Sequence, residues 1–114
     1  MHELSVAQNI AEIVESEAKN RQASCVTGVL LEIGELAGIE LEALEFAWSA
    51  VIENTLLNKA KLQIDGVRGK AKCISCGKEF DIHELFDLCP DCKSFGNEIL
   101  QGKELRIKSI DIEY

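Results

Sequence analysis

Two pairs of cysteines constrain the fold of this chain more than any other feature. The segment CISCGKEFDIHELFDLCPDC contains Cys73 and Cys76 in one pair and Cys89 and Cys92 in the other, with two residues inside each pair. The tight turn of such a pair aims both sulfurs in the same direction. Two pairs therefore supply a closed tetrahedral set of four thiolates, which is typical of structural Zn²⁺. We predict a zinc site formed by these four cysteines.

The metal should decide how the surrounding segment folds. Residues 70–101 hold four of the five cysteines and the only proline of the chain. A module of about thirty residues buries too little apolar surface to fold alone, so the ion should supply its folding energy. Four thiolates leave no open position for water or substrate, so we expect no catalysis there. We expect a small apolar cluster beside the ion, formed by Phe80, Ile82, Leu85, Phe86 and Phe95.

Two other interpretations of the cysteine pairs predict different functions. The CxxCG…CPxC pattern also resembles the iron site of rubredoxin, which would imply electron transfer, but this segment lacks the Trp and Tyr residues common around that iron. A nucleic-acid-binding zinc ribbon is the second interpretation. Residues 70–101 contain four lysines and six acidic residues, a net charge of −2, and the whole chain carries −8. Phosphate would be repelled, so we predict no nucleic-acid partner.

Apolar periodicity on either side of the cysteine segment predicts two helices and three strands. The helices should cover residues 3–20 and 40–54, and the strands should lie within residues 25–38, 60–65 and 103–114. The last strand cannot be stable alone, so it should pair with the first two. The predicted fold is α/β (α+β), with two helices on a small three-stranded sheet and an inserted zinc ribbon. The predicted domains are residues 1–69 plus 102–114, and residues 70–101.

The sequence contains no apparent targeting or membrane segment. No run approaches eighteen consecutive apolar residues, and the first residues lack the basic region of a secretory signal. We therefore expect a cytoplasmic protein without a membrane partner, in a compartment where thiols stay reduced. The odd cysteine count agrees with metal ligands rather than disulfides. Cys25 has no partner pair and is interpreted as a small, buried or half-buried residue rather than a reactive thiol.

The chain begins MHEL, and these first residues could bind a second metal ion. The amine of Met1, the backbone nitrogen of His2 and its imidazole Nδ1 can form fused chelate rings on one ion. The backbone nitrogen of Glu3 could complete a planar set that suits Ni²⁺ or Cu²⁺, or its carboxylate could join an octahedral set with water. The sequence leaves both donor sets open.

The order of these motifs resembles the HypA/HybF family of hydrogenase-maturation nickel metallochaperones over nearly the whole length. The matching features are the MHE-x-S start, the IGELAG turn, the Glu-rich second helix and the CxxC–x12–CxxC insertion followed by a closing strand. The resemblance implies a transported Ni²⁺ at Met1, His2 and Glu3, in the first predicted domain, and a structural Zn²⁺ at the four cysteines. Glu40 occupies the place of a carboxylate that is sometimes near the nickel site, although a first-turn helix charge is the alternative interpretation.

The resemblance also implies a function and partners. The family delivers nickel to the [NiFe]-hydrogenase large subunit together with a HypB-type GTPase. In some organisms it also serves urease, so a urease accessory protein is a further implied partner. No Ser/His/Asp set or phosphate loop is present, so we predict a delivery protein rather than an enzyme. The alternative is a zinc-ribbon adaptor or regulator that carries no metal. His83, between the cysteine pairs, is interpreted as solvated or packed rather than as a ligand.

Overall fold

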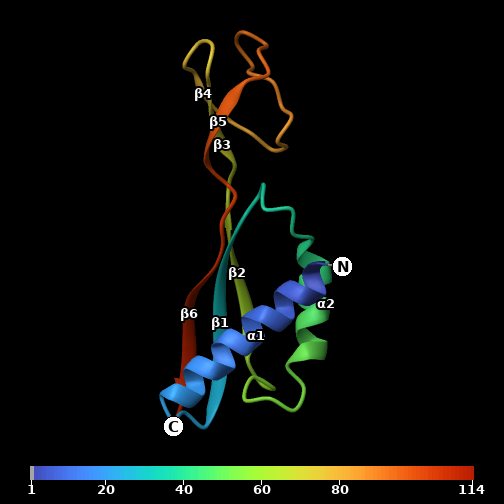
Figure 1. Cartoon of the computed structure of the whole chain (residues 1–114), viewed down its shortest axis with the longest axis vertical. Coiled ribbons are helices and arrows are strands. Elements are labelled where there is room, and N and C mark those ends of the chain that lie inside the picture. Colours follow the sequence, from blue (N-terminus) through green and yellow to red (C-terminus); the bar gives the residue numbers. More distant parts are fainter. Residues whose placement is uncertain (1) are drawn as a thin grey trace. The chain divides into compact units, whose positions relative to one another are not determined.

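The computed structural model describes residues 2–114, and within that range the chain forms two helices and six strands (Figure 1). The two helices form one layer, and the three long strands form the sheet of the other. They are α1 (His2–Asn20), β1 (Cys25–Gly34), α2 (Leu41–Val51), β2 (Lys61–Val67) and β6 (Leu105–Glu113). Three short strands lie between β2 and β6 in the chain, namely β3 (Lys70–Cys73), β4 (Glu79–Asp81) and β5 (Asn97–Gln101).

The strands form two three-stranded sheets. The first has the order β2-β1-β6 and the second the order β4-β3-β5. In the second sheet β3 runs antiparallel to both neighbours, with Lys70 opposite Asp81 and Cys73 opposite Asn97. The predicted α/β (α+β) fold is confirmed, including the insertion before the last strand. That strand, β6, joins the first two in one sheet but pairs with β1 only. The second helix ends at Val51, three residues earlier than predicted, and Asn54 has a positive φ of 60° in the turns that follow.

The chain divides into two compact units, whose boundaries fall within the long strands. Unit 1 contains the described residues up to Leu31 together with Ile39–Ile64 and Ile107–Tyr114, and unit 2 contains Glu32–Gly38 and Asp65–Arg106. Unit 2 therefore includes short segments beyond the 70–101 insertion. The assignment of these parts as a nickel-binding domain and a zinc module stays a prediction. No helix within residues 2–114 is long and apolar enough to span a membrane.

Aliphatic side chains build the core of unit 1. Most of the apolar stripe predicted for the first helix is buried, at Ala7, Ile10, Ala11, Val14 and Ala18, but Leu4 and Ile13, which the prediction also placed on it, are exposed. Helix α1 packs against α2 on one face of the sheet (Figure 1). On α2 the buried residues are Leu44, Ala47 and Trp48, and on β1 they include Val26, Val29 and Leu31. Because small alanines occupy much of the α1 stripe, the helix can approach its neighbours closely.

The two ends of α1 are each tied to another part of unit 1. At its first turn, the carboxylate of Glu3 accepts a hydrogen bond from the backbone N–H of Glu40, at 3.1 Å, just before α2. Beyond its last turn, the backbone N–H of Ser24 donates to the carbonyl of Glu113, at 2.8 Å. The C-terminal end of β6 therefore lies beside the loop that leaves α1.

Unit 2 has a small core of its own. Ala71, Cys73, Phe80, Ile82 and Cys89 are buried, and Leu36 and Ile99 pack against them. The predicted cluster is thus correct for Phe80 and Ile82 but wrong for the other three members. Leu85, Phe86 and Phe95 are exposed, because Leu36, Ile99 and two of the cysteines already fill the space around the core.

Three glycines in unit 2 lie where backbone segments approach each other closely. A Cβ added to Gly34 would overlap the carbonyl oxygen of Gly102, and one added to Gly69 would overlap that of Ile82. Gly102 also has a φ of +120°, and a Cβ there would lie 2.7 Å from the Cα of Gly69. Any other residue at these positions would force backbone atoms apart.

Candidate metal centre

Each cysteine pair lies in a turn with the same hydrogen-bond pattern. In the first turn Cys73 N–H donates to the carbonyl of Lys78, at 2.8 Å, and Gly77 N–H donates to the carbonyl of Cys73, at 2.9 Å. In the second turn Cys89 N–H donates to Ser94, and Lys93 N–H donates back to Cys89, both at 3.0 Å. The residue after each pair has a positive φ, 77° at Gly77 and 63° at Lys93. This backbone geometry aims both sulfurs of each turn at one point.

The structure brings the four predicted zinc ligands together. The sulfurs of Cys73, Cys76, Cys89 and Cys92 all lie within 4.8 Å of one another. Cys73 and Cys92 are 3.5 Å apart, and Cys76 and Cys89 are 3.7 Å apart. A tetrahedral ion with metal–sulfur bonds of about 2.3 Å has sulfurs about 3.8 Å apart. The separations therefore fit a single ion held by four thiolates.

The surroundings of the sulfurs favour thiolates at two of the four positions. The Ser94 hydroxyl, 3.3 Å from Cys92 Sγ, and the Ser94 backbone lower the pKa of Cys92 to about 6. The backbone N–H of Cys92 lowers the pKa of Cys89. The backbone N–H of Lys78 acts in the same direction on Cys76, but desolvation and the neighbouring thiols raise the pKa of Cys76 to about 12. A bound cation must therefore displace protons, so its affinity should fall as the pH falls.

The chain start places His2 and Glu3 in the first turn of α1, while Met1 and its predicted ligand role lie outside the described residues. The His2 side chain is 60% exposed and the Glu3 side chain 13% exposed. His2 Nε2 lies 3.4 Å from the Glu3 carboxylate oxygen that also accepts the Glu40 N–H. That hydrogen bond, followed by a hydrogen bond from the backbone of Glu3 itself, lowers the pKa of Glu3. An exposed imidazole therefore lies beside an anchored carboxylate.

Glu40 contributes its backbone rather than its side chain to this contact. It is the N-cap residue of α2, and its side chain makes no capping hydrogen bond. Its N–H points to Glu3, so the structure brings the two residues together through the backbone of one and the carboxylate of the other. The ligand role of the Glu40 carboxylate stays a prediction.

His83 lies outside the four-sulfur cluster and pairs with a carboxylate instead. Its Nδ1 is 2.7 Å from Oε2 of Glu35, whose Oε1 accepts the backbone N–H of Gly69 at 2.9 Å. The Glu35 carboxylate raises the pKa of His83, and the Gly69 N–H and then His83 lower the pKa of Glu35. Sequence analysis missed this pair, because the partners are 48 positions apart and no local pattern joins them.

Cys25 also lies apart from the cluster. It is half-buried at the start of β1, as predicted, with its sulfur 4.0 Å from the Glu113 carboxylate. Its contacts are those of a packed strand residue.

Comparison with known proteins identifies a single family. Residues 1–112 match the family model HypA, described as "Hydrogenase/urease nickel incorporation, metallochaperone, hypA". The chain is 43% identical to the hydrogenase maturation factor HypA of Geobacter metallireducens over 113 residues, which cover 99% of this chain and 100% of that protein. It is 46% identical to the factor of the same name from Parabacteroides distasonis, with 99% and 98% covered.

Solved structures have the same fold. The solution structure of the Ni metallochaperone HypA from Helicobacter pylori matches with a TM-score of 0.67 and 26% identity, covering 97% of both chains. A second solution structure, of a protein also named HypA, matches with a TM-score of 0.70 and 28% identity, covering 98% of this chain and 96% of the other.

Proposed function

Because the chain belongs to the HypA family of hydrogenase and urease nickel-incorporation metallochaperones, we propose that it binds Ni²⁺ at its N-terminus and delivers it to a [NiFe]-hydrogenase large subunit. Urease is a second recipient in hosts that contain it. The protein acts in the cytoplasm and binds and releases metal rather than catalysing a reaction. A HypB-type GTPase and, where urease is served, a urease accessory protein are its proposed partners.

The observation that carries this proposal is the exposed imidazole of His2 in the first turn of α1. The first N–H groups of a helix have no intrahelical acceptors. The backbone nitrogens of His2 and Glu3 are therefore free of helical hydrogen bonds and can serve as metal donors, together with the amine of Met1 and the imidazole. Anchoring of Glu3 by Glu40 N–H fixes this turn in place. The exposed side chain of Glu40 is a further candidate ligand.

Transfer by ligand exchange requires an open site. Because the His2 side chain is largely exposed, a recipient can replace the donors one at a time without unfolding the chaperone. Protonation of the imidazole and the amine should weaken binding as the pH falls. The four-sulfur cluster has the opposite character, since two of its ligands are buried and its four donors close the coordination shell.

We assign Zn²⁺ to the four-cysteine cluster, with a structural role. The sulfur separations support this assignment, and a d¹⁰ ion without redox chemistry suits a closed tetrahedral cage. The small core of unit 2 contains only five buried residues, so the ion is needed to hold the two cysteine turns together. Zinc would keep unit 2 folded while nickel passes through the other site.

A nickel titration with two matched histidine variants tests the proposal. The chain has two histidines, so His2→Ala removes the proposed ligand and His83→Ala is the control. We expect His2→Ala, and a variant with extra residues ahead of Met1, to lose nickel binding while His83→Ala and the zinc content stay unchanged. Nickel X-ray absorption would identify the planar or octahedral donor set. Retention of nickel affinity in both N-terminal variants would favour the adaptor function instead.

A further inference from the structure

Unit 2 carries seven of the twelve large hydrophobic side chains that are exposed within the described residues. Five of them lie between Cys73 and β5 in the chain, and we call them the apolar patch. Their exposed fractions are 73% for Ile74, 54% for Leu85, 65% for Phe86, 51% for Leu88 and 64% for Phe95. The core of unit 2 is complete without them. Large exposed apolar side chains that gather on neighbouring segments mark a protein interaction site.

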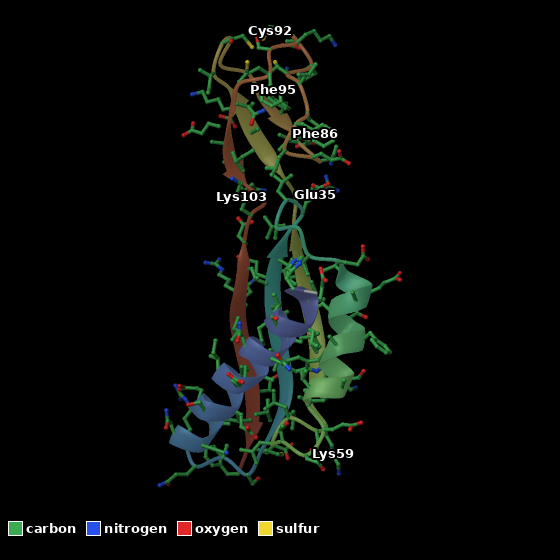
Figure 2. All side chains as sticks on the ribbon, turned by 45° about the vertical axis from the view of Figure 1, so that its right-hand side comes forward. Glu35, Lys59, Phe86, Cys92, Phe95 and Lys103 are labelled. Atoms are coloured by element: carbon green, nitrogen blue, oxygen red, sulfur yellow. The ribbon has the colours of Figure 1, made fainter. Side chains whose placement is uncertain are left out.

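Hydrogen bonds join the segments that carry the patch. The side-chain amide of Asn97 donates to the carbonyl of Asp87, at 3.4 Å, and to that of Phe95, at 3.2 Å. This one amide therefore connects the segment of Phe86 and Leu88 to Phe95. Ile74 N–H donates to the carbonyl of Gly96, next to Phe95, at 3.1 Å. Figure 2 shows Phe86 and Phe95 on the loop segment between β4 and β5.

The metal site fixes the position of the patch. Ile74 directly follows Cys73, and Leu88 directly precedes Cys89, and both of these cysteines are buried ligands of the proposed zinc ion. The patch should therefore form only in the metal-bound protein.

The rim of the patch is acidic, which indicates the chemistry of its partner. Glu84 precedes Leu85, and Asp87 lies between Phe86 and Leu88. Asp91 is paired with Lys78 at 3.6 Å, so it adds little net charge. Four thiolates around Zn²⁺ add a further −2, against the single positive charge of Lys93. An apolar surface flanked by Lys or Arg would match this rim, whereas a second copy of the chain, with its net charge of −8, would not.

We propose that the apolar patch is the surface on which the [NiFe]-hydrogenase large-subunit precursor docks, through an apolar segment flanked by basic residues. The proposal rests on the proposed function, because it names the recipient of the nickel. Ligand exchange requires His2 to remain free to move between donors. If unit 2 supplies the binding energy for the precursor, the nickel-binding turn in unit 1 need not contact the precursor tightly, and His2 stays free to exchange.

Binding of the nickel-free precursor to the zinc-loaded full chain tests the proposal. The double variant Phe86→Ser/Phe95→Ser should raise the Kd by about tenfold or more, since aromatic side chains dominate interface energies. Glu84→Lys should weaken binding and reduce its dependence on salt. Phe46→Ser is the matched control, because Phe46 is 80% exposed on α2 in unit 1, and its Kd should change by less than about twofold.

Three results would overturn the docking proposal. They are an unchanged Kd in the double variant, a loss of binding in Phe46→Ser, and no binding of the precursor to the unmodified chain. Self-association that the double variant abolishes would identify the patch as a contact between copies, which also contradicts the proposal. Nickel titration of the double variant should match the unmodified chain, so a docking failure is distinguishable from a failure of nickel binding.

Discussion

Gly69→Ala should destabilise unit 2 by about 3 kcal/mol, whereas Gly66→Ala should change its stability by less than about 1 kcal/mol. A Cβ on Gly69 would lie inside 3.0 Å of the carbonyl oxygen of Ile82 and 3.2 Å from a methyl carbon of Leu36. A Cβ on Gly66, three residues earlier in the same chain segment, would meet nothing within 4 Å. The two variants make the same chemical change in different surroundings.

The magnitude for Gly69→Ala follows from what the new methyl group would meet. Overpacking costs about 1–3 kcal/mol when side chains can move. Here the main obstacle is a backbone oxygen, and the same two residues share a hydrogen bond from Ile82 N–H to the Gly69 carbonyl, at 3.0 Å. Gly69 N–H also donates to Glu35. Separation of the two segments would weaken both bonds, so the cost should lie at the upper end of that range.

Competition with a zinc chelator measures this loss. If folding of unit 2 is coupled to the metal, about 3 kcal/mol corresponds to a zinc affinity weaker by about 100-fold. Fluorescence of Trp48, which is buried in unit 1, reports on the other unit during the same titration. Equal zinc affinities for the Gly69 and Gly66 variants would refute the reasoning.

Three further changes have defined outcomes. Glu3→Ala should speed hydrogen exchange at Glu40 N–H, while Glu3→Gln keeps a carbonyl acceptor and should slow that exchange relative to alanine; equal rates in the two variants would show that the contact adds no protection. Glu35→Gln should lower the pKa of His83 toward 6.5 in an NMR titration, because Glu35 raises it. Because the pKa of His83 is raised in the folded protein, the ion pair stabilises the protein fully below about pH 6.5, and this stabilisation is lost as the pH rises through the pKa that His83 has in the folded state. Because the pKa of Glu35 is lowered, the same pair stabilises the protein above about pH 4.5, and this stabilisation is lost as the pH falls through the pKa that Glu35 has in the folded state. His83→Ala should therefore lower the free energy of unfolding most between about pH 4.5 and 6.5, and least near pH 8. Cys89→Ser should abolish zinc binding and amide protection in unit 2 without changing Trp48 emission, and retained zinc at full stoichiometry would contradict a four-thiolate site.

Features encoded by local spacing could be predicted from the sequence. The 3.6-residue apolar period predicted the extent of α1 and most of its buried stripe, although Leu4 and Ile13 are exposed. The CxxC spacing identified four sulfurs that the fold brings within 4.8 Å of one another. In both cases the constraint lies within one turn or one helix face, where neighbouring residues decide the geometry.

Features that depend on contacts between distant segments could not be predicted. Pairing of His83 with Glu35, and of Glu3 with the backbone of Glu40, needs the fold before the partners meet. Lys93 adopts the positive φ that glycine adopts at the equivalent place in the first cysteine turn, so no glycine marked it. The exposure of Phe86 was also missed. A hydrophobic side chain is expected to be buried, but the sequence does not say whether the core of its own chain or a binding partner covers it.

The hydrogen bond between Ser24 and Glu113 has a practical consequence for measurement. It holds the end of β6 beside the loop that follows α1. The 19 residues of α1 span about 28 Å, so this end lies far from the first turn of the helix, where His2 is located. Tyr114 is exposed at that far end of unit 1. A fluorophore or a surface tether attached at Tyr114 would therefore leave the first turn unobstructed, and immobilised protein could be loaded and unloaded with metal repeatedly.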